Sequence, residues 1–173
     1  LGLWRAFADH ADGAVERAGL TRYRWRGPIA PGAGQIAEPL SIHSDGTIDF
    51  APRSTPVADD AVATRRFALV ERGVAVGLAL TRAEAGARRA EPNGGVANLI
   101  VEPGGWAGLA DEPPPGPTLE VRRLHALAID PHTAEATLDV ALALLHPGGG
   151  RPPAPVTGGT LRLDAIAALA RAR

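Results

Sequence analysis

The chain has 173 residues, of which 45% are hydrophobic, and its formal net charge is −1. This length and apolar content suit a single domain over residues 1–173, and the near-neutral charge gives no reason to expect nucleic acid or an anionic membrane as a partner. The absence of cysteine excludes disulfides and thiolate zinc sites within the chain, and agrees with a cytoplasmic location. The sequence also lacks an apolar run of about 18 residues, so no membrane span is predicted.

The sequence contains no methionine. A chain without methionine lacks its own translation start. We therefore expect it to be part of a longer native protein, with some of that protein upstream of Leu1.

The N-terminal region combines one helical pattern with short extended segments. Apolar side chains recur at helical spacing over residues 1–18, and Gly19 follows as a stop signal. A short strand is predicted over residues 21–26. A second strand is predicted over residues 39–42, leading into a turn at 44–46.

The clearest unit is a predicted β-hairpin that follows an irregular, Pro- and Asp-rich segment at residues 49–64. Apolar residues alternate over 67–70 and again over 74–80, on either side of the turn sequence Glu-Arg-Gly. The return strand carries Ala, Gly and Ala on one face, which indicates close packing there. We interpret the hairpin as a wall whose small-residue face admits another strand or a peptide backbone.

The chain continues with shorter signals. Residues 82–89 (RAEAGARR) predict a short helix or turn, and residues 96–104 (VANLIVEPG) predict a strand. Residues 111–117 (DEPPPGP) read as an exposed loop, and residues 119–130 alternate as a strand.

Two C-terminal segments complete the prediction. Residues 138–145 alternate like a strand, although their composition favours helix. Residues 158–173 predict an amphipathic closing helix, with Leu163 and Ile166 on its apolar face.

No catalytic motif stands out. His125, His132 and His146 are the natural metal candidates, but they lack the His-Glu-x-x-His spacing, and scattered histidines are more often surface residues. No serine lies in a Gly-x-Ser-x-Gly motif. The carboxylates of Asp59 and Asp60 could act as acid and base, but nothing distinguishes them from loop charges.

Two arginine pairs are candidate binding residues. Arg65–Arg66 and Arg88–Arg89 could hold a carboxylate or backbone carbonyls, since guanidinium groups bind both. Each pair could equally be a solvated end of a strand or helix. Composition and spacing alone lead no further than a strand-rich domain.

Three segments in order resemble the C-terminal domain of the TldD/PmbA family, metallopeptidase-related proteins also labelled modulators of DNA gyrase. The segments read PLSIHSDGT, STPVADDAVATRRFALVERGVAVGLALTRAEAGARR and NLIVEPG. Residues 59–66 stand where the family has an acidic-Gly-Val-x-Thr stretch, with Ala61 in place of the glycine, and Asn98 begins the third segment. The later strand–turn–strand–turn–helix plan is also similar and favours a strand over residues 138–145.

The resemblance implies an α+β fold of mainly antiparallel strands, as a barrel-like or strongly curved sheet with an N-terminal and a C-terminal helix. In catalytic members a His-Glu-x-x-x-His zinc motif precedes this region, and a cysteine in the far C-terminal tail completes the zinc site. This sequence has neither and stops before the family's last strand. It therefore resembles the metal-free PmbA/TldE-like type, with no metal or catalytic residues in this chain and zinc only upstream or in a partner.

The implied partners are a zinc-bearing TldD-type subunit, or a second copy, and a peptide substrate. Such a heterodimer degrades unfolded peptides or matures peptide natural products. The expected role is a subunit interface or a peptide groove, with binding residues Arg65, Arg66, Arg88, Arg89 and Asn98.

Two alternatives remain open. The domain could serve structure or regulation without binding peptide. It could also be a divergent metal enzyme that uses His125, His132 and His146.

Overall fold

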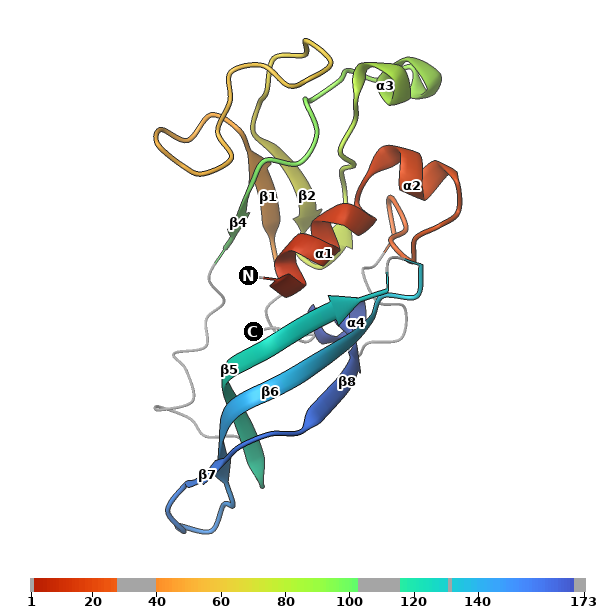
Figure 1. The fold of residues 1–173 in the computed structure, drawn as a ribbon. Coiled ribbons are helices and arrows are strands. Elements are labelled where there is room, and N and C mark those ends of the chain that lie inside the picture. Colours follow the sequence, from red (N-terminus) through yellow and green to blue (C-terminus); the bar gives the residue numbers. More distant parts are fainter. Residues whose placement is uncertain (1, 28–39, 103–115, 131, 170–173) are drawn as a thin grey trace.

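The computed structural model describes residues 2–27, 40–102, 116–130 and 132–169. They form two antiparallel sheets and four helices (Figure 1). The first sheet has the order β3-β2-β1-β4 and consists of β1 (Ile42–Asp45), β2 (Phe67–Glu71), β3 (Val74–Ala75) and β4 (Asn98–Val101). The second consists of β5 (Thr118–Ile129), β6 (Glu135–His146), β7 (Ala154–Val156) and β8 (Thr160–Asp164). The helices are α1 (Gly2–His10), α2 (Gly13–Arg17), α3 (Arg82–Arg88) and α4 (Ala165–Leu169).

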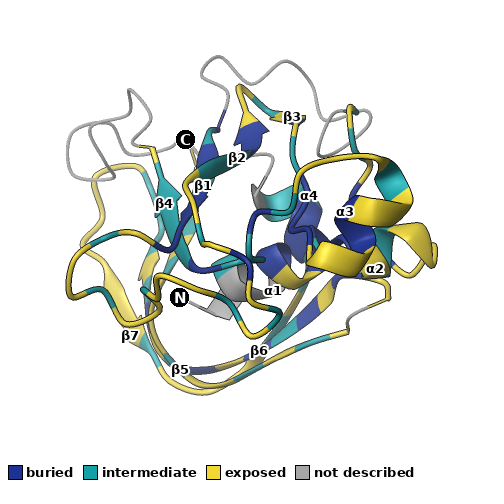
Figure 2. Ribbon diagram, turned by 90° about the horizontal axis from the view of Figure 1, so that it is seen from above, coloured by how far each residue is buried: buried dark blue, intermediate teal, exposed yellow. Residues whose placement is uncertain are grey.

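Strand β6 is the centre of the second sheet. It pairs with β5 along one edge, and with β7 and then β8 end to end along the other. The β5–β6 register shifts three times between Val121 and Ala126. Such irregularities bend and twist a strand pair, which accounts for its strong curvature (Figure 2).

The predicted fold class is confirmed. The chain is α+β with antiparallel sheets, one of them strongly curved, and helices near both ends. Over the described residues the sheets do not close into a barrel. No helix in this part of the chain has the length and apolar character needed to cross a membrane.

Helix α1 lies between the two sheets, where it contacts α4, β4 and β5 (Figures 1 and 2). The main core joins both halves of the molecule, because Ile166 of α4 packs in the same cluster as side chains from α1 and the first sheet. The largest fully buried apolar side chains of this core are Phe7, Tyr23, Ile42, Leu69, Val70 and Ile166. A smaller cluster lies within the second sheet around Ala136, Leu138 and Ala165.

The small residues after β3 let the chain's own backbone approach closely. A Cβ at Gly77 would lie 2.0 Å from the carbonyl oxygen of Ala68, so only glycine fits there. The amide of Ala79 donates to Ala11 O, and the carbonyl of Ala79 accepts from Gly13 N, both at 2.9 Å. The predicted close approach is therefore made by the N-terminal segment of the same chain.

Tyr23 fastens this arrangement from the core. Its hydroxyl donates to Leu69 O at 2.6 Å and lies 2.7 Å from Gly77 O, and its ring packs edge-on against Phe7. Burial raises the pKa of the phenol, which keeps it in the protonated, donating form.

The prediction of one helix over residues 1–18 was wrong in one respect, because the segment forms α1 and α2 with a break between them. Asp12 causes the break. Its backbone is extended, its Oδ1 accepts from the amides of Ala14 and Val15, and it forms a bridge with Ala79. An Asp cap of this kind starts a new helix.

The early strand predictions also need correction. Residues 21–26 form no strand: Gly27 N donates to Arg24 O in a turn, and Arg26 has a left-handed backbone with φ of 66°. The strand predicted over 39–42 instead runs from Ile42 to Asp45, through the predicted turn at 44–46.

The return strand of the hairpin is shorter than the predicted 74–80. Regular pairing stops after Ala75, because the amides of Val76 and Gly77 both donate to Leu69 O. The closing helix predicted over 158–173 begins as strand β8, which pairs with β6, and only Ala165–Leu169 is helical. Leu161 and Leu163 alternate along β8, a strand period hidden inside a helix-like composition.

Several predictions are confirmed. The irregular segment 49–64 and the strands near 98–101, 119–129 and 138–145 are all present, and the short helix or turn predicted over 82–89 is a helix from Arg82 to Arg88. Most of the loop predicted at 111–117 lies outside the described residues.

Candidate functional site

Arg65 and Arg66 lie at the exposed entry to β2. Arg65 donates from Nη1 to Glu91 Oε2 at 2.8 Å, so its charge already has a partner within the chain. Arg66 is also exposed.

Arg88 and Arg89 lie at the end of α3 and have different roles. Arg88 is half-buried and donates from Nη2 to Gly13 O and to Glu16 Oε2, both at 2.8 Å. These contacts tie α3 to α2. Arg89 ends the helix in a left-handed conformation, with φ of 53°. The structure therefore does not gather the two arginine pairs into one binding site.

Asn98, the fifth predicted binding residue, anchors a loop. Its Nδ2 donates to Asp45 O and to Ser54 Oγ, both at 2.9 Å, and its Oδ1 accepts from Arg53 N at 3.0 Å. Asn98 thus fixes the segment after β1 against the start of β4.

The three candidate metal-binding histidines are separated. His146 pairs with Thr118 at one end of the β5–β6 ladder, while His132 lies in the turn at the other end. His125 is exposed partway along β5. In the described ranges no three His, Asp or Glu side chains gather as a metal-binding group.

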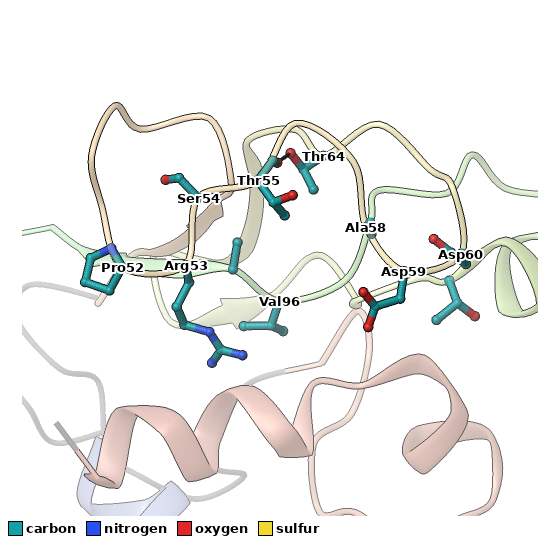
Figure 3. Close-up of a pocket in the computed structure, with 12 residues that line it drawn as sticks. Pro52, Arg53, Ser54, Thr55, Ala58, Asp59, Asp60, Thr64 and Val96 are labelled. Atoms are coloured by element: carbon teal, nitrogen blue, oxygen red, sulfur yellow. Dashed lines mark hydrogen bonds between the residues drawn. The ribbon is translucent and has the colours of Figure 1, made fainter.

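A pocket of about 520 Å³ opens beside the loop that Asn98 anchors (Figure 3). We call it the loop pocket. One side comes from the irregular segment 52–64 and the other from the strand approach at 94–97, and Thr81 contributes from the N-cap of α3. The lining residues are Pro52, Arg53, Ser54, Thr55, Ala58, Asp59, Asp60, Thr64, Thr81, Gly94, Val96 and Ala97.

Most polar side chains that line the loop pocket form hydrogen bonds with the protein's own backbone. Ser54 and Thr64 donate to backbone carbonyls within the loop, and Thr55 donates to Val57 O at 2.7 Å. Asp60 accepts from the amide of Arg82 at 2.6 Å, and Thr81 accepts from Glu84 N at 3.3 Å. These bonds give the pocket a fixed wall even though its loop has no regular secondary structure.

Two charged groups of the lining stand apart from these bonds. Within the described residues, neither the guanidinium of Arg53 nor the carboxylate of Asp59 has a hydrogen-bond or ion-pair partner. Both side chains are exposed, and Figure 3 shows them extending from the loop toward the same side. The loop pocket therefore offers one positive and one negative group to a ligand.

Asp45 supports the base of the loop. The hydroxyl and the backbone amide of Thr47 donate to its Oδ1 at 2.6 and 2.8 Å, and these bonds lower the pKa of the Asp45 carboxyl below its usual value. Asp45 is thus ionised at neutral pH and keeps the turn after β1 closed.

Ala61 occupies the place where the family pattern has glycine. Its φ is 58°, the left-handed region that glycine adopts without steric cost. Its amide donates to Ala58 O at 2.9 Å, and its carbonyl accepts from Arg82 Nη2 at 3.0 Å. The turn that the family glycine would favour is retained here with alanine.

The sequence offered Asp59 as a possible acid or base that nothing distinguished from a loop charge, and it gave no sign of Arg53. Both residues lie in a segment without periodicity, so no pattern indicated which side chains share a face. The only available signals were a charged residue next to Pro52 for Arg53 and a pair of acidic residues for Asp59, and both are common in solvated loops.

Solved structures show that this fold is known. The chain superposes on TldE from Thermococcus kodakarensis with a TM-score of 0.65 and 16% identity, covering 92% of this chain and 38% of that one. A protein from Thermotoga maritima, proposed to be a modulator of a DNA gyrase, gives 0.71 and 21%, covering 96% and 40%. A Bacteroides thetaiotaomicron protein with a similar description gives 0.69 and 15%, covering 97% and 37%. The chain thus spans well under half the length of these proteins.

The sequence itself identifies the family. Residues 31–172 match the PmbA/TldA metallopeptidase C-terminal domain. Because this match covers most of the chain, the chain belongs to the PmbA/TldD family, which confirms the family that the sequence resembles. The metal-free type stays a prediction. A comparison with curated protein sequences found no match.

Proposed function

We propose that this chain is a non-catalytic C-terminal domain that supplies a subunit interface, and part of a peptide groove, to a zinc-bearing protein of the PmbA/TldD family. The zinc would reside in an upstream domain or in a TldD-type partner subunit, and the assembly would act in the cytoplasm on unfolded or precursor peptides. A second copy of this chain is the alternative partner.

One observation supports an interface most directly. Four large apolar side chains are exposed on the half of the β5–β6 ribbon that carries β7. They are Leu119, Val121, Leu142 and Leu145, each 36–39% exposed. Leu119, Val121 and Leu145 share one face of the ribbon, and we call these three the β5–β6 apolar strip, whereas Leu142 points to the other face. Leu119 lies directly opposite Leu145 in the ladder, so their side chains share a face.

An exposed apolar strip on a long strand pair is typical of a surface that a protein partner covers. The outer edge of β5 adds to this, because the described strands of that sheet leave it unpaired. An unpaired edge can accept a further strand by backbone hydrogen bonding.

The test is co-purification of the tagged full-length protein with a co-expressed His-Glu-x-x-x-His-bearing subunit, followed by light scattering. We expect a stable complex that is lost in the double variant Leu119→Glu, Leu145→Glu. Leu20→Glu is the matched control, because Leu20 is 46% exposed in the first half of the chain. A complex that survives the double variant, or a protein that remains a monomer with every such subunit, would contradict the proposal.

Activity of the complex separates the two proposed roles. Hydrolysis of an unfolded protein substrate by the complex, but not by either subunit alone, supports a contribution to the peptide groove. A complex whose hydrolysis equals that of the zinc subunit alone indicates a structural or regulatory domain.

A further inference from the structure

We propose that the loop pocket binds a small zwitterion, a molecule carrying one carboxylate and one ammonium group, with Arg53 holding the carboxylate and Asp59 the ammonium. This inference goes beyond the proposed subunit interface and does not depend on it. The loop pocket belongs to segments 52–64 and 94–97, whereas the apolar strip lies on β5 and β6.

The size of the pocket suits a small molecule. Its volume of about 520 Å³ falls in the range of roughly 300–1,000 Å³ that is typical of small-molecule sites. Such sites combine an apolar lining with a few polar groups that fix orientation. Here Ala58, Val96 and Ala97 supply apolar surface.

The charges of the pocket decide the class of ligand. The hydroxyls of Ser54, Thr55 and Thr64 are engaged with the loop's own backbone, as described above. Only Arg53 and Asp59 present charged ends without a partner among the described residues. A guanidinium favours a carboxylate, with which it forms paired hydrogen bonds, and a carboxylate favours an ammonium donor.

A ligand with a single charge fits less well. A simple anion would satisfy Arg53 but would be repelled by the carboxylates of Asp59 and Asp60, and a simple cation would satisfy Asp59 but would be repelled by Arg53. Arg53 and Asp59 form no ion pair within 4.0 Å, so they do not neutralise each other. A zwitterion satisfies both groups at once.

The hydrogen bonds that hold the walls of the loop pocket do not involve the charged groups of Arg53 and Asp59. Arg53 is fixed through its backbone amide, which donates to Asn98 Oδ1, and Asp59 precedes the Asp60 carboxylate that accepts from Arg82 N. Neither charged end contributes to these bonds. Substitution of either side chain should therefore leave the fold intact.

The experiment titrates the purified protein with ω-amino acids of increasing length, from glycine to 6-aminohexanoate, and follows backbone amide shifts by NMR. Hexanoate and hexylamine, each with one of the two charges, are the paired controls. We expect saturable shifts at Gly94, Val96 and Ala97 with at least one zwitterion, and binding of either control at least fivefold weaker.

Variants test the two residues separately. Arg53→Gln and Asp59→Asn should each weaken binding of the best zwitterion by about fivefold, the effect of losing one exposed charged contact of about 1 kcal/mol. Arg162→Gln and Asp139→Asn are the controls, because both residues are exposed on the second sheet, away from the pocket. Equal binding by hexanoate or hexylamine, no pocket shifts with any zwitterion, or unchanged affinity in Arg53→Gln and Asp59→Asn would each overturn the assignment.

Discussion

The two sheets of this domain differ in a way that strand length does not predict. The first sheet has strands of two to five residues, yet β1 and β2 carry fully buried side chains such as Ile42, Leu69 and Val70. The second sheet has two strands of 12 residues, yet much of their surface is exposed. The burial of a strand's side chains therefore depends on the elements that pack against it and not on how many residues it pairs. Helix α1 and Tyr23 cover the first sheet, whereas Leu119, Val121 and Leu145 of the β5–β6 ribbon stay exposed.

The largest expected difference is between two leucines, one in each sheet. Leu69→Ala removes a side chain with 0% exposure from the main core, and we expect a loss of about 3 kcal/mol in the free energy of unfolding. Leu142→Ala, at a position 38% exposed, should cost less than about 1 kcal/mol. Urea unfolding of both variants measures this. Similar losses of unfolding free energy in the two variants would show that the second sheet contributes as much to stability as the first.

Gly77→Ala should be the next most damaging change. The added methyl group would overlap the carbonyl oxygen of Ala68, so the close approach beside β2 has to open, at a cost of about 2–3 kcal/mol. Gly86→Ala is the control, because Gly86 lies in α3 with no atom within 4 Å of the added methyl group. The control should stabilise the protein by about 0.5–1 kcal/mol. Thermal unfolding of the two variants should move in opposite directions.

Tyr23→Phe tests the hydroxyl that links Leu69 of β2 to Gly77, which follows β3. The ring and its contact with Phe7 remain, but the carbonyls of Leu69 and Gly77 lose their phenolic partner. We expect a loss of about 1–2 kcal/mol in the free energy of unfolding. A Tyr23→Phe protein as stable as the parent would show that the amides of Val76 and Gly77, which also donate to Leu69 O, satisfy that carbonyl without the phenol.

His10 makes stability depend on pH. It is buried, its Nδ1 pairs with Thr21 Oγ1 at 2.8 Å, and its Nε2 has no partner among the described residues. Burial lowers the pKa of its imidazole, and the nearby charge of Arg22 adds to this effect. Three nearby carboxylates act in the opposite direction, those of Asp9, Asp130 and Asp164.

Because the folded-state pKa is below that of the unfolded chain, the unfolded state binds the proton more readily. The stability from neutral His10 is present above about pH 6.5 and declines as the pH falls through the folded-state pKa, by at most about 1.4 kcal/mol per pH unit. His10→Asn should reduce this slope between pH 7.5 and 5.5. The lowered pKa of Asp45 affects a more acidic range. An unchanged slope in urea unfolding would exclude His10 as the cause.

The smallest expected effect concerns the turn beside the loop pocket. Ala61→Gly removes the strain of a left-handed alanine, which exceeds the backbone entropy that glycine costs, so we expect stabilisation by about 0.5 kcal/mol. Ala83→Gly, in the exposed part of α3, should instead destabilise the protein by about 1 kcal/mol. Destabilisation by both changes would show that Ala61 is not strained.

The sequence indicated the strands best where each could be recognised from its own residues. The alternating runs of β2 and β5 were found directly, and the family resemblance decided β6. The misassigned segments are those whose structure depends on distant partners. Asp12 breaks the first helix through a bridge to Ala79, and residues 160–164 form a strand because they pair with β6.

The candidate binding residues stay a prediction, but their contacts within the chain could not be foreseen from the sequence. Arg65 and Arg88 have partners within the chain, and Asn98 secures a loop, so side-chain type alone did not indicate their roles. Arg53 and Asp59 face one pocket only because Asn98 and Asp60 shape the loop between them. A loop shaped by hydrogen bonds to distant residues shows no periodic pattern in the sequence.

The turn between β5 and β6 has a consequence for how the chain folds. Asp130 Oδ1 accepts from the amides of His132 and Thr133 at 2.8 and 2.9 Å, which closes the hairpin over a few residues. Strand β1, by contrast, must find partners as distant as Val101 before its sheet exists. Since closing a short loop costs less chain entropy than closing a long one, the long hairpin should assemble early and independently. The second sheet, whose long strands are the more exposed in the folded protein, would then begin to form before the well-buried first sheet.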